Sequence, residues 1–398
     1  MQGLRLHCDT WSKLKYVSQF ENQPGFDFLR HSRNPNVPTE VLVPADLLDD
    51  FKLELSENRI AYEIFIEDVS TAIDEGLEQQ RKARLTDSSS DDILKSFPRY
   101  DEIKRYLDGL WRTHRGTVTQ FVLGKSFEGR DIVGVKISSS GTNKPAVFID
   151  AGIHAREWIA PTTAIYAVRQ LVENVTNSYL FDNVDIYVVP SLNVDGYEYT
   201  HKDKYTRLWR KTRSINPESR CVGTDGNRNF DYYWATVGAS NNPCAETYAG
   251  PKPFSEPETV ALRDFLLSIE NLRVYLSFHS YGNYILYPWS YTAELPENEP
   301  ELRCVGKKAE LALSKVRGTR FTVGSSMATL YASAGSSDDW AMAVAGSSLA
   351  YTIELPGGSW QFAPPPREIL PVGQEVFEAL KVFVQYADGE ICQDAASQ

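Results

Sequence analysis

Residues 144–158, KPAVFIDAGIHAREW, decide the fold that we expect for this chain. The apolar run 146–149 has the composition of a buried strand, Gly152 follows it, and a run of helical periodicity begins at Pro161. The stretch therefore predicts a strand, a tight turn and a helix start. His154 and Glu157 lie just after the strand, at the end where open α/β sheets bind their ligands.

His154 and Glu157 carry two ligand types of a hydrolytic zinc ion, an imidazole nitrogen and a carboxylate oxygen. By itself, such a His-x-x-Glu pair is more often a local salt bridge or a helix cap. The chain contains six histidines, and His279 also follows a strand-like run, 274–278. Two imidazoles and one carboxylate leave a fourth position for water, so the three residues predict a catalytic site for one Zn²⁺ per chain.

The composition bounds the class of protein. At 398 residues the chain is long enough for two domains, or for one large α/β domain with an appendage. A net charge of −12 argues against nucleic acid as a partner, because phosphate binding requires a basic face. No apolar run reaches the roughly 18 residues of a membrane span, so we expect no membrane association. Residues 1–5 lack a signal-peptide core, so we expect a cytosolic protein or one whose leader was removed.

The first part of the chain predicts a small α+β unit over residues 1–80. Runs 39–43 and 60–66 read as strands, and 46–55 as a helix with Asp46 as its N-cap. The basic cluster 81–84 precedes a Ser- and Asp-rich segment, 85–92, which has the composition of a linker. Such a cluster is usually a solvated helix end, but beside a flexible segment it is also a site for a trypsin-like protease.

The remainder of the chain predicts alternating strands and helices. An amphipathic helix is indicated by the apolar spacing of Ile103, Tyr106, Leu107, Leu110 and Trp111. The alternation favours a parallel or mixed sheet covered on both faces. The expected strands are 132–137, 146–149, 184–189, 274–278 and 349–355, and the expected helices are 162–172, 258–268 and 372–386.

Five cysteines cannot all pair with one another. Cys221 and Cys244 enclose a Gly-, Asn- and Asp-rich loop and are the pair that we expect to form a disulfide. Cys8, Cys304 and Cys392 stay unassigned, with at least one free thiol among them. The sequon that begins at Asn174 fits a secreted protein, although such triplets also arise by chance.

Six motifs in register give the chain a specific resemblance. It resembles the pancreatic-type zinc carboxypeptidases, the carboxypeptidase A/B family, in the order and approximate spacing of HAREW (154–158), LWRK (208–211), DGNRN (225–229), PFSEPE (253–258), HSY (279–281) and TIEL (352–355). The resemblance implies a catalytic domain, 97–398, whose mixed eight-stranded sheet is flanked by helices. It also implies an inhibitory, ferredoxin-like α+β pro-domain, 1–80, and a connecting segment, 81–96. We therefore expect a secreted, monomeric zymogen that a trypsin-like protease cleaves after Arg84.

The same resemblance implies roles for individual residues. Glu354 resembles the general base, Arg210 the group that holds the oxyanion, and Asp225 the acid that orients the first zinc-binding histidine. Substrates are peptides with a free C-terminus, and the residues expected to bind them are Arg156, Asn227, Arg228, Tyr281 and the mobile Tyr331.

Substrate preference is expected to depend on Asp338. A carboxylate there resembles the B type, which takes C-terminal Lys or Arg, and the small Ser290 and Ser326 leave room for a long side chain. This assignment would change if the alignment with the family slipped by one residue at Asp338 and Asp339, or if Asp338 only capped a turn. The alternative is the A type, which takes apolar residues. A non-catalytic protein that grips peptide C-termini is a further alternative, although no ligand or base is missing. The segment after Leu355 lacks the charged residues common in the family, and one residue is inserted between Trp340 and Glu354.

Overall fold

The computed structural model describes residues 1–392 apart from positions 22, 24, 31, 33, 36, 87–91 and 359–360. His31 and most of the predicted linker therefore lie outside the described residues. No helix in the described ranges is both long and apolar enough to cross a membrane.

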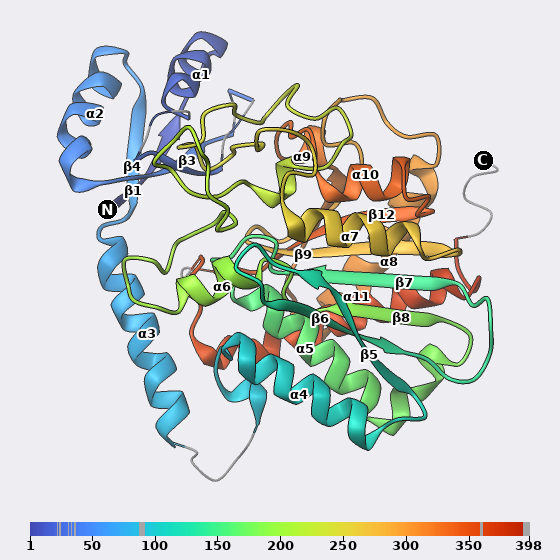
Figure 1. The fold of residues 1–398 in the computed structure, drawn as a ribbon. Coiled ribbons are helices and arrows are strands. Elements are labelled where there is room, and N and C mark those ends of the chain that lie inside the picture. Colours follow the sequence, from blue (N-terminus) through green and yellow to red (C-terminus); the bar gives the residue numbers. More distant parts are fainter. Residues whose placement is uncertain are drawn as a thin grey trace.

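A small antiparallel sheet forms the N-terminal domain (Figure 1, blue). Its strand order is β2-β3-β1-β4, and its strands alternate with helices in the βαββαβ pattern of ferredoxin-like domains. The core of this domain is apolar and includes the buried residues Leu4, Leu6, Val41 and Phe51. Its elements are β1 (Gln2–His7), α1 (Trp11–Val17), η1 (Ser18–Phe20), β2 (Asp27–Arg30), β3 (Thr39–Val43), α2 (Ala45–Glu57) and β4 (Ala61–Ile66).

The predicted N-cap of the second helix is wrong. Helix α2 begins at Ala45 and its N-cap is Pro44, so Asp46 lies in the first turn. A carboxylate is favourable there as well, because the first turn carries the positive end of the helix dipole.

Helix α3 (Val69–Thr86) follows β4 and leads away from the small sheet (Figure 1). It contains the whole basic cluster 81–84, so the helix continues past Arg84 into the predicted linker. The chain then enters the large domain through η2 (Ile93–Lys95).

The large domain is built on a mixed eight-stranded sheet, as the resemblance implied. The strand order is β11-β10-β12-β9-β7-β8-β6-β5. Strands β12, β9, β7 and β8 run parallel at the centre, while β6 and β5 are antiparallel at one edge. The strands are β5 (Val118–Lys125), β6 (Asp131–Ile137), β7 (Ala146–Ala151), β8 (Asp185–Val189), β9 (Leu272–Ser280), β10 (Tyr284–Tyr287), β11 (Thr322–Ser325) and β12 (Leu349–Leu355).

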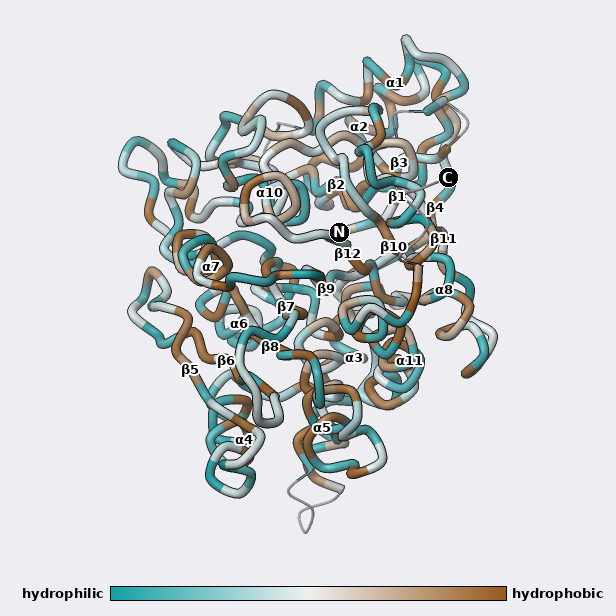
Figure 2. Tube along the Cα trace, turned by 90° about the vertical axis from the view of Figure 1, so that its right-hand side faces the viewer, coloured by the Kyte–Doolittle hydropathy of each residue, from teal (hydrophilic) through white to brown (hydrophobic). Residues whose placement is uncertain are grey.

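Helices cover both faces of this sheet. Helices α5, α8 and α11 pack together on one side, and α7 and α10 contact strands on the other (Figure 2). The helices are α4 (Tyr100–Thr113), α5 (Ile159–Val172), α6 (Val194–Thr200), α7 (Pro257–Leu267), α8 (Glu299–Arg317), α9 (Ser326–Thr329), α10 (Ser337–Ala343) and α11 (Ile369–Ala387), with 3₁₀ turns η3 (Val175–Phe181), η4 (Gly226–Arg228) and η5 (Pro366–Glu368). His201 caps the C-terminal end of α6 and stacks on Trp158 with ring centroids 4.0 Å apart.

The predicted strand, turn and helix over 144–158 are present. Strand β7 ends at Ala151, Gly152 turns the chain with φ +67°, and α5 starts at Ile159. A side chain at Gly152 would also meet Pro161 at 3.1 Å, so the turn requires glycine. The parallel pairing of β7, β9 and β12 brings the carboxyl ends of three strands to one edge, and this edge carries the candidate site.

Candidate active site

Three side chains converge at this edge of the sheet. His154 Nδ1 lies 2.8 Å from Glu157 Oε1 and 3.1 Å from His279 Nδ1, and His279 Nδ1 lies 3.3 Å from Glu157 Oε2. All three residues are buried. In the described ranges this is the one group of His, Cys, Asp or Glu side chains that could hold a metal ion.

The donor set fits zinc. Zinc bonds of about 2.0–2.2 Å in a tetrahedral arrangement separate the ligand atoms by slightly more than the distances found between these three. The electrostatics also favour a cation. Burial alone would lower the pKa of His279, but the Glu157 carboxylate raises it to about 9, so this position attracts positive charge. Burial opposes the charge on Glu157 too, yet the two imidazoles hold its pKa below the usual range.

Asp225 supports His154 from behind. Its Oδ1 lies 3.0 Å from His154 Nε2, and its Oδ2 accepts a hydrogen bond of 2.8 Å from Arg210 Nη2. Burial would raise the pKa of Asp225, but Arg210 and His154 hold it well below its usual range. The charged carboxylate orients the ring so that Nδ1 faces the other donors, as expected of a carboxylate behind a metal ligand.

Glu354 stands directly beside the ligand group. It is paired with His279 across strands β12 and β9, and it lines the same pocket as the three ligands. Burial raises its pKa to about 7, which His279 and Arg210 partly oppose. A carboxylate with this pKa can both accept and donate a proton near neutral pH.

One pocket brings together every residue that the sequence predicted for substrate binding: Arg156, Asn227, Arg228, Tyr281, Ser290, Ser326, Tyr331 and Asp338. Arg228 is fixed by hydrogen bonds from Nε to the Gly238 carbonyl and from Nη1 to the Asn227 carbonyl. Tyr331 lines the pocket together with Arg228 and Arg210. Burial raises the pKa of its phenol, and the positive charges of the two arginines partly oppose that rise.

Two adjacent carboxylates, Asp338 and Asp339, have different environments, and Asp338 is the one that lines the pocket. Asp338 is 1% exposed, and its side chain accepts hydrogen bonds from Thr352 Oγ1 at 3.2 Å and from the Asp339 amide at 3.0 Å. Asp339 accepts from the backbone amides of Ser290 and Tyr291 instead. Burial, followed by the charge of Asp338, raises the pKa of Asp339 well above its usual range. No salt bridge between described residues includes Asp338.

The N-terminal domain closes the mouth of this pocket. Asp27, at the start of β2, forms a bidentate ion pair with Arg156, whose guanidinium also lies 4.2 Å from the Phe362 ring centre. Arg30 Nη2 donates to Tyr284 Oη at 3.0 Å, and Phe28, Leu29 and Arg30 line the pocket together with the ligand residues. A peptide could reach the ligands only after this domain moves.

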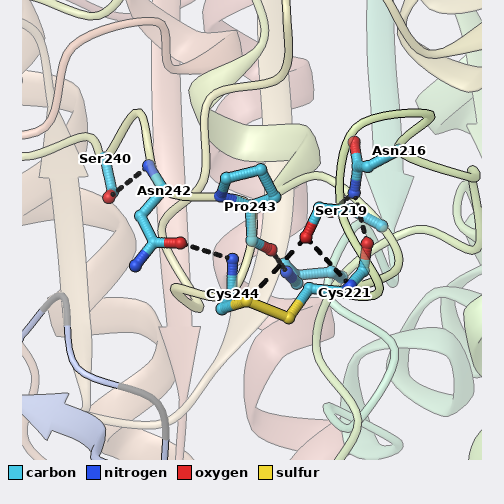
Figure 3. Close-up of a disulfide and its surroundings, with 9 residues drawn as sticks. Asn216, Ser219, Cys221, Ser240, Asn242, Pro243 and Cys244 are labelled. Atoms are coloured by element: carbon cyan, nitrogen blue, oxygen red, sulfur yellow. Dashed lines mark hydrogen bonds between the residues drawn. A yellow bond between two sulfur atoms is a disulfide. The ribbon is translucent and has the colours of Figure 1, made fainter.

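Two disulfides are present in the described part of the chain. Cys221 and Cys244 are joined as predicted, and Figure 3 shows Asn242 accepting a hydrogen bond from the Cys244 amide. The disulfide between Cys221 and Cys244 closes the loop that carries Asp225, Asn227 and Arg228. The second disulfide joins Cys304 to Cys392, which the sequence left unassigned, and Cys8 stays a buried free thiol in the N-terminal domain.

Some residues of the site were not anticipated from the sequence. Asp27 and Phe362 line the site or its entrance, and neither belongs to a motif whose spacing marks it. Thr352 also lines the site; it opens the TIEL motif, but the sequence assigned it no role. Ser277 was visible as the Ser-x-His pair in β9, which places its side chain on the same face of the sheet as His279.

The fold and the site define a zinc hydrolase whose pocket is covered by its own N-terminal domain. Residues 103–379 match the zinc carboxypeptidase family, and residues 4–76 match the carboxypeptidase activation peptide. The chain belongs to the zinc carboxypeptidase family and has the organisation of a procarboxypeptidase.

Known relatives support this assignment. The chain is 45% identical to carboxypeptidase B of Astacus astacus over 295 residues, which cover 73% of this chain and 97% of the relative. It is 36% identical to carboxypeptidase A1 of Rattus norvegicus over 97% of this chain and 93% of the relative. The crystal structure of carboxypeptidase A from Helicoverpa armigera aligns with a TM-score of 0.92 at 31% identity, covering 98% of this chain and 97% of that one. Relatives of both specificity types are thus similar to this chain.

Proposed function

We propose that this zinc carboxypeptidase removes C-terminal Lys or Arg from peptides, as the B type does. The observation that carries the proposal is the buried Asp338 carboxylate, which lines the pocket and lacks a cationic partner among the described residues. Leaving a carboxylate buried and unpaired is costly, so a pocket of this kind favours a ligand that brings a positive charge. Ser290 and Ser326 are both small and line the same pocket.

The residues around the ligand group support a hydrolytic mechanism. Zinc, when bound to His154, Glu157 and His279, supplies Lewis-acid chemistry that makes water more acidic and polarises a carbonyl. Glu354 takes a proton from the attacking water as the water oxygen bonds to the scissile carbonyl carbon. The C–N bond then breaks, and Glu354 gives the proton to the leaving amine. Arg210 donates hydrogen bonds to the carbonyl oxygen as negative charge develops on it.

The substrate carboxylate requires its own site. We assign this role to Arg228 and Asn227, which line the same pocket as the ligand group and Asp338. A guanidinium can donate two parallel hydrogen bonds to a carboxylate, which fixes the end of the peptide chain. Arg156, Tyr281 and Tyr331 line the same pocket. We assign Arg156 and Tyr281 to contacts with upstream residues of the peptide, and Tyr331 to covering the terminal residue.

We also propose how the zymogen is divided and activated. The pro-domain is 1–80, the connecting segment 81–96 and the catalytic domain 97–398, with cleavage after Arg84 by a trypsin-like protease. Arg84 Nη2 donates to the Phe97 carbonyl at 2.8 Å and pairs with Glu102 at 2.9 Å, and the helix continues beyond it. Cleavage there therefore requires the last turn of α3 to unwind. Arg81 and Lys82 are more exposed and are the alternative sites.

Two further expectations depend on this function. We propose that the protein is secreted, which the two disulfides support because such bonds persist in oxidising compartments. We also propose that it acts as a monomer.

The specificity is tested with the trypsin-activated enzyme on two matched peptides, one ending in Arg and one in Phe. We expect kcat/KM to favour the Arg peptide by about 100-fold or more, since a desolvated charge pair is worth several kcal/mol. Asp338→Asn keeps the shape but removes the charge, and it should reduce this preference by about tenfold or more while leaving the rate on the Phe peptide within about threefold. Equal rates of the parent enzyme on both peptides would refute the B-type assignment, and a preference for Phe would establish the A type.

A further inference from the structure

The second histidine of the ligand group, His279, has a polar support that differs from that of the first. In the parallel pairing of β7 with β9, Asp150 lies opposite Ser277. Side chains two residues apart on a strand point to the same face, so Ser277 and His279 share one face of the sheet. The pairing therefore brings Asp150, Ser277 and His279 into one buried row.

Hydrogen bonds connect this row. Ser277 Oγ donates to Asp150 Oδ1 at 2.8 Å, and the same oxygen lies 3.1 Å from His279 Nε2. All three residues are buried, and no salt bridge between described residues includes Asp150. The carboxylate is therefore not held there by a cation of its own.

The direction of these bonds fixes the histidine tautomer. A serine hydroxyl has one hydrogen, and here the carboxylate takes it. Ser277 Oγ can then face the ring only as an acceptor, so His279 Nε2 must carry its hydrogen. In the neutral ring Nδ1 is left with a free lone pair, and Nδ1 is the atom that faces His154 and Glu157.

We propose that Ser277 and Asp150 are positioning residues that hold His279 in the Nε2–H tautomer, ready to bind zinc through Nδ1. His154 receives the same support directly from Asp225. His279 receives it through the Ser277 hydroxyl, which donates its hydrogen to Asp150 and accepts one from the His279 ring. Asp150 is therefore separated from the zinc-binding ring by one additional side chain, that of Ser277. It lies on β7, the strand that precedes His154. The inference rests on the proposed ligand set of His154, Glu157 and His279.

The test measures zinc affinity of the full chain with a competing chelator, in parallel with the unfolding temperature of the metal-free protein. Ser277→Ala should weaken zinc binding by about 10- to 100-fold, the range found when the support of a metal-binding histidine is removed. Ser277→Thr keeps the hydroxyl and should restore most of the affinity. Asp150→Asn is nearly isosteric, but its amide can donate a hydrogen bond to Ser277. The Ser277 hydroxyl can then donate to His279 Nε2 and favour the wrong tautomer, so this variant should also weaken zinc binding.

Ser280→Ala is the matched control. Ser280 is buried in the same strand, and its hydroxyl has no hydrogen-bond partner in the described structure, so this variant should keep the parent zinc affinity. Nuclear magnetic resonance of ¹⁵N-labelled histidines supplies a second readout. It is recorded on the metal-free protein at a pH above the raised pKa of His279, where the ring is neutral. The His279 ring should then report the Nε2–H tautomer in the parent protein and lose that preference in Ser277→Ala.

The outcomes separate this inference from the proposed function. If His279→Ala keeps its zinc, the ligand set itself is wrong. If His279→Ala loses zinc but Ser277→Ala and Asp150→Asn bind it as the parent does, the positioning role is refuted while the ligand set stands. A loss of metal-free stability in Ser277→Ala that Ser277→Thr repairs, without any change in zinc affinity or tautomer, would show that the row serves packing alone.

Discussion

The two domains of this zymogen bury different kinds of side chain. The core cluster of the pro-domain is apolar. Polar residues of this domain that lie near the catalytic domain, such as Asp27 and Arg30, form hydrogen bonds across the interface. The catalytic domain instead buries charged groups at the carboxyl ends of its central strands, including Glu157, Asp225 and Asp338. The difference indicates that the catalytic domain carries the chemistry and that the pro-domain controls access to it. Substitutions in the catalytic domain should alter the activated enzyme, and substitutions in the pro-domain should alter only the zymogen.

The largest effect is expected for the group assigned to proton transfer. Glu354→Gln keeps the size of the side chain but cannot accept a proton, so kcat of the trypsin-activated enzyme should fall by about 100- to 10,000-fold. Zinc content and unfolding temperature should stay near those of the parent, because Glu354 is not among the proposed ligands. Parent-like activity in a variant of confirmed sequence would overturn the general-base assignment and, with it, part of the contrast between the domains.

The next effect lies on the other side of the interface. Asp27→Asn removes the charge that faces the buried Arg156, and breaking one partner of a buried ion pair is strongly destabilising. The intact zymogen should therefore open more often, and its residual activity on a small peptide should rise by about tenfold or more.

After trypsin treatment and removal of the pro-domain, Asp27→Asn and the parent should be indistinguishable. Asp9→Asn is a suitable control, since Asp9 pairs with Lys13 within the pro-domain itself. A change in the activated enzyme, or an unchanged zymogen, would contradict the division of roles between the domains.

The sequence predicts the strands, helices and site residues of these two domains to different extents. The strand, turn and helix of 144–158 were predicted because an apolar run, a glycine and a helical period are all local signals. Six motifs in register then located the ligand group and Glu354. Strands β1 and β2 were missed because both carry charged residues, and β2 has only four residues. Helix α8 was missed although Pro300 and the left-handed Gly318 mark its ends.

The contacts between distant segments could not be predicted in this way. The ion pair of Asp27 with Arg156 joins residues 129 positions apart, and the row of Asp150, Ser277 and His279 depends on the register between β7 and β9. Local patterns do not specify strand register, which is set by the packing of the whole sheet. The second disulfide is of the same kind, since Cys304 and Cys392 meet only once α8 and the end of the chain are in place.

A smaller effect is expected where the connecting helix is held to the catalytic domain. The Gln80 side chain pairs with both the amide and the carbonyl of Phe97, as a strand partner would. Each such hydrogen bond contributes about 1 kcal/mol. Gln80→Ala should therefore let the end of α3 open more often, and trypsin should cleave the zymogen several-fold faster, since cleavage tracks the open population when reclosing is fast.

Gln79→Ala is the control for this variant, because among the described residues the Gln79 side chain accepts a single, longer bond of 3.3 Å from Arg367. The cleavage rate is followed by gel electrophoresis, and the new N-terminus is sequenced to locate the cut. A start at Leu85 supports cleavage after Arg84, and a start at Lys82 or Ala83 would move the site to the exposed part of the cluster. Equal rates in Gln80→Ala and the parent would show that this clamp does not limit activation.

The smallest effect is a pH dependence of the closed state. Burial, followed by the charge of Asp27, raises the pKa of Glu246 in the zymogen. Displacing the pro-domain removes Asp27 and part of the burial, so the pKa of Glu246 falls again when the pocket opens. The closed state thus holds this proton more tightly. Its added stability is complete below the ordinary range of a glutamate, falls as pH rises toward the raised pKa, and is absent above it.

The residual activity of the zymogen, divided by that of the activated enzyme at the same pH, should therefore rise a few-fold as pH increases through this window. Glu246→Gln cannot ionise and should flatten the rise while leaving the closed state intact. A ratio that does not change with pH in the parent, or one that changes equally in Glu246→Gln, would mean that the facing carboxylates of the two domains do not regulate access. In that case the ion pair of Asp27 with Arg156 alone would account for the electrostatic part of the closure.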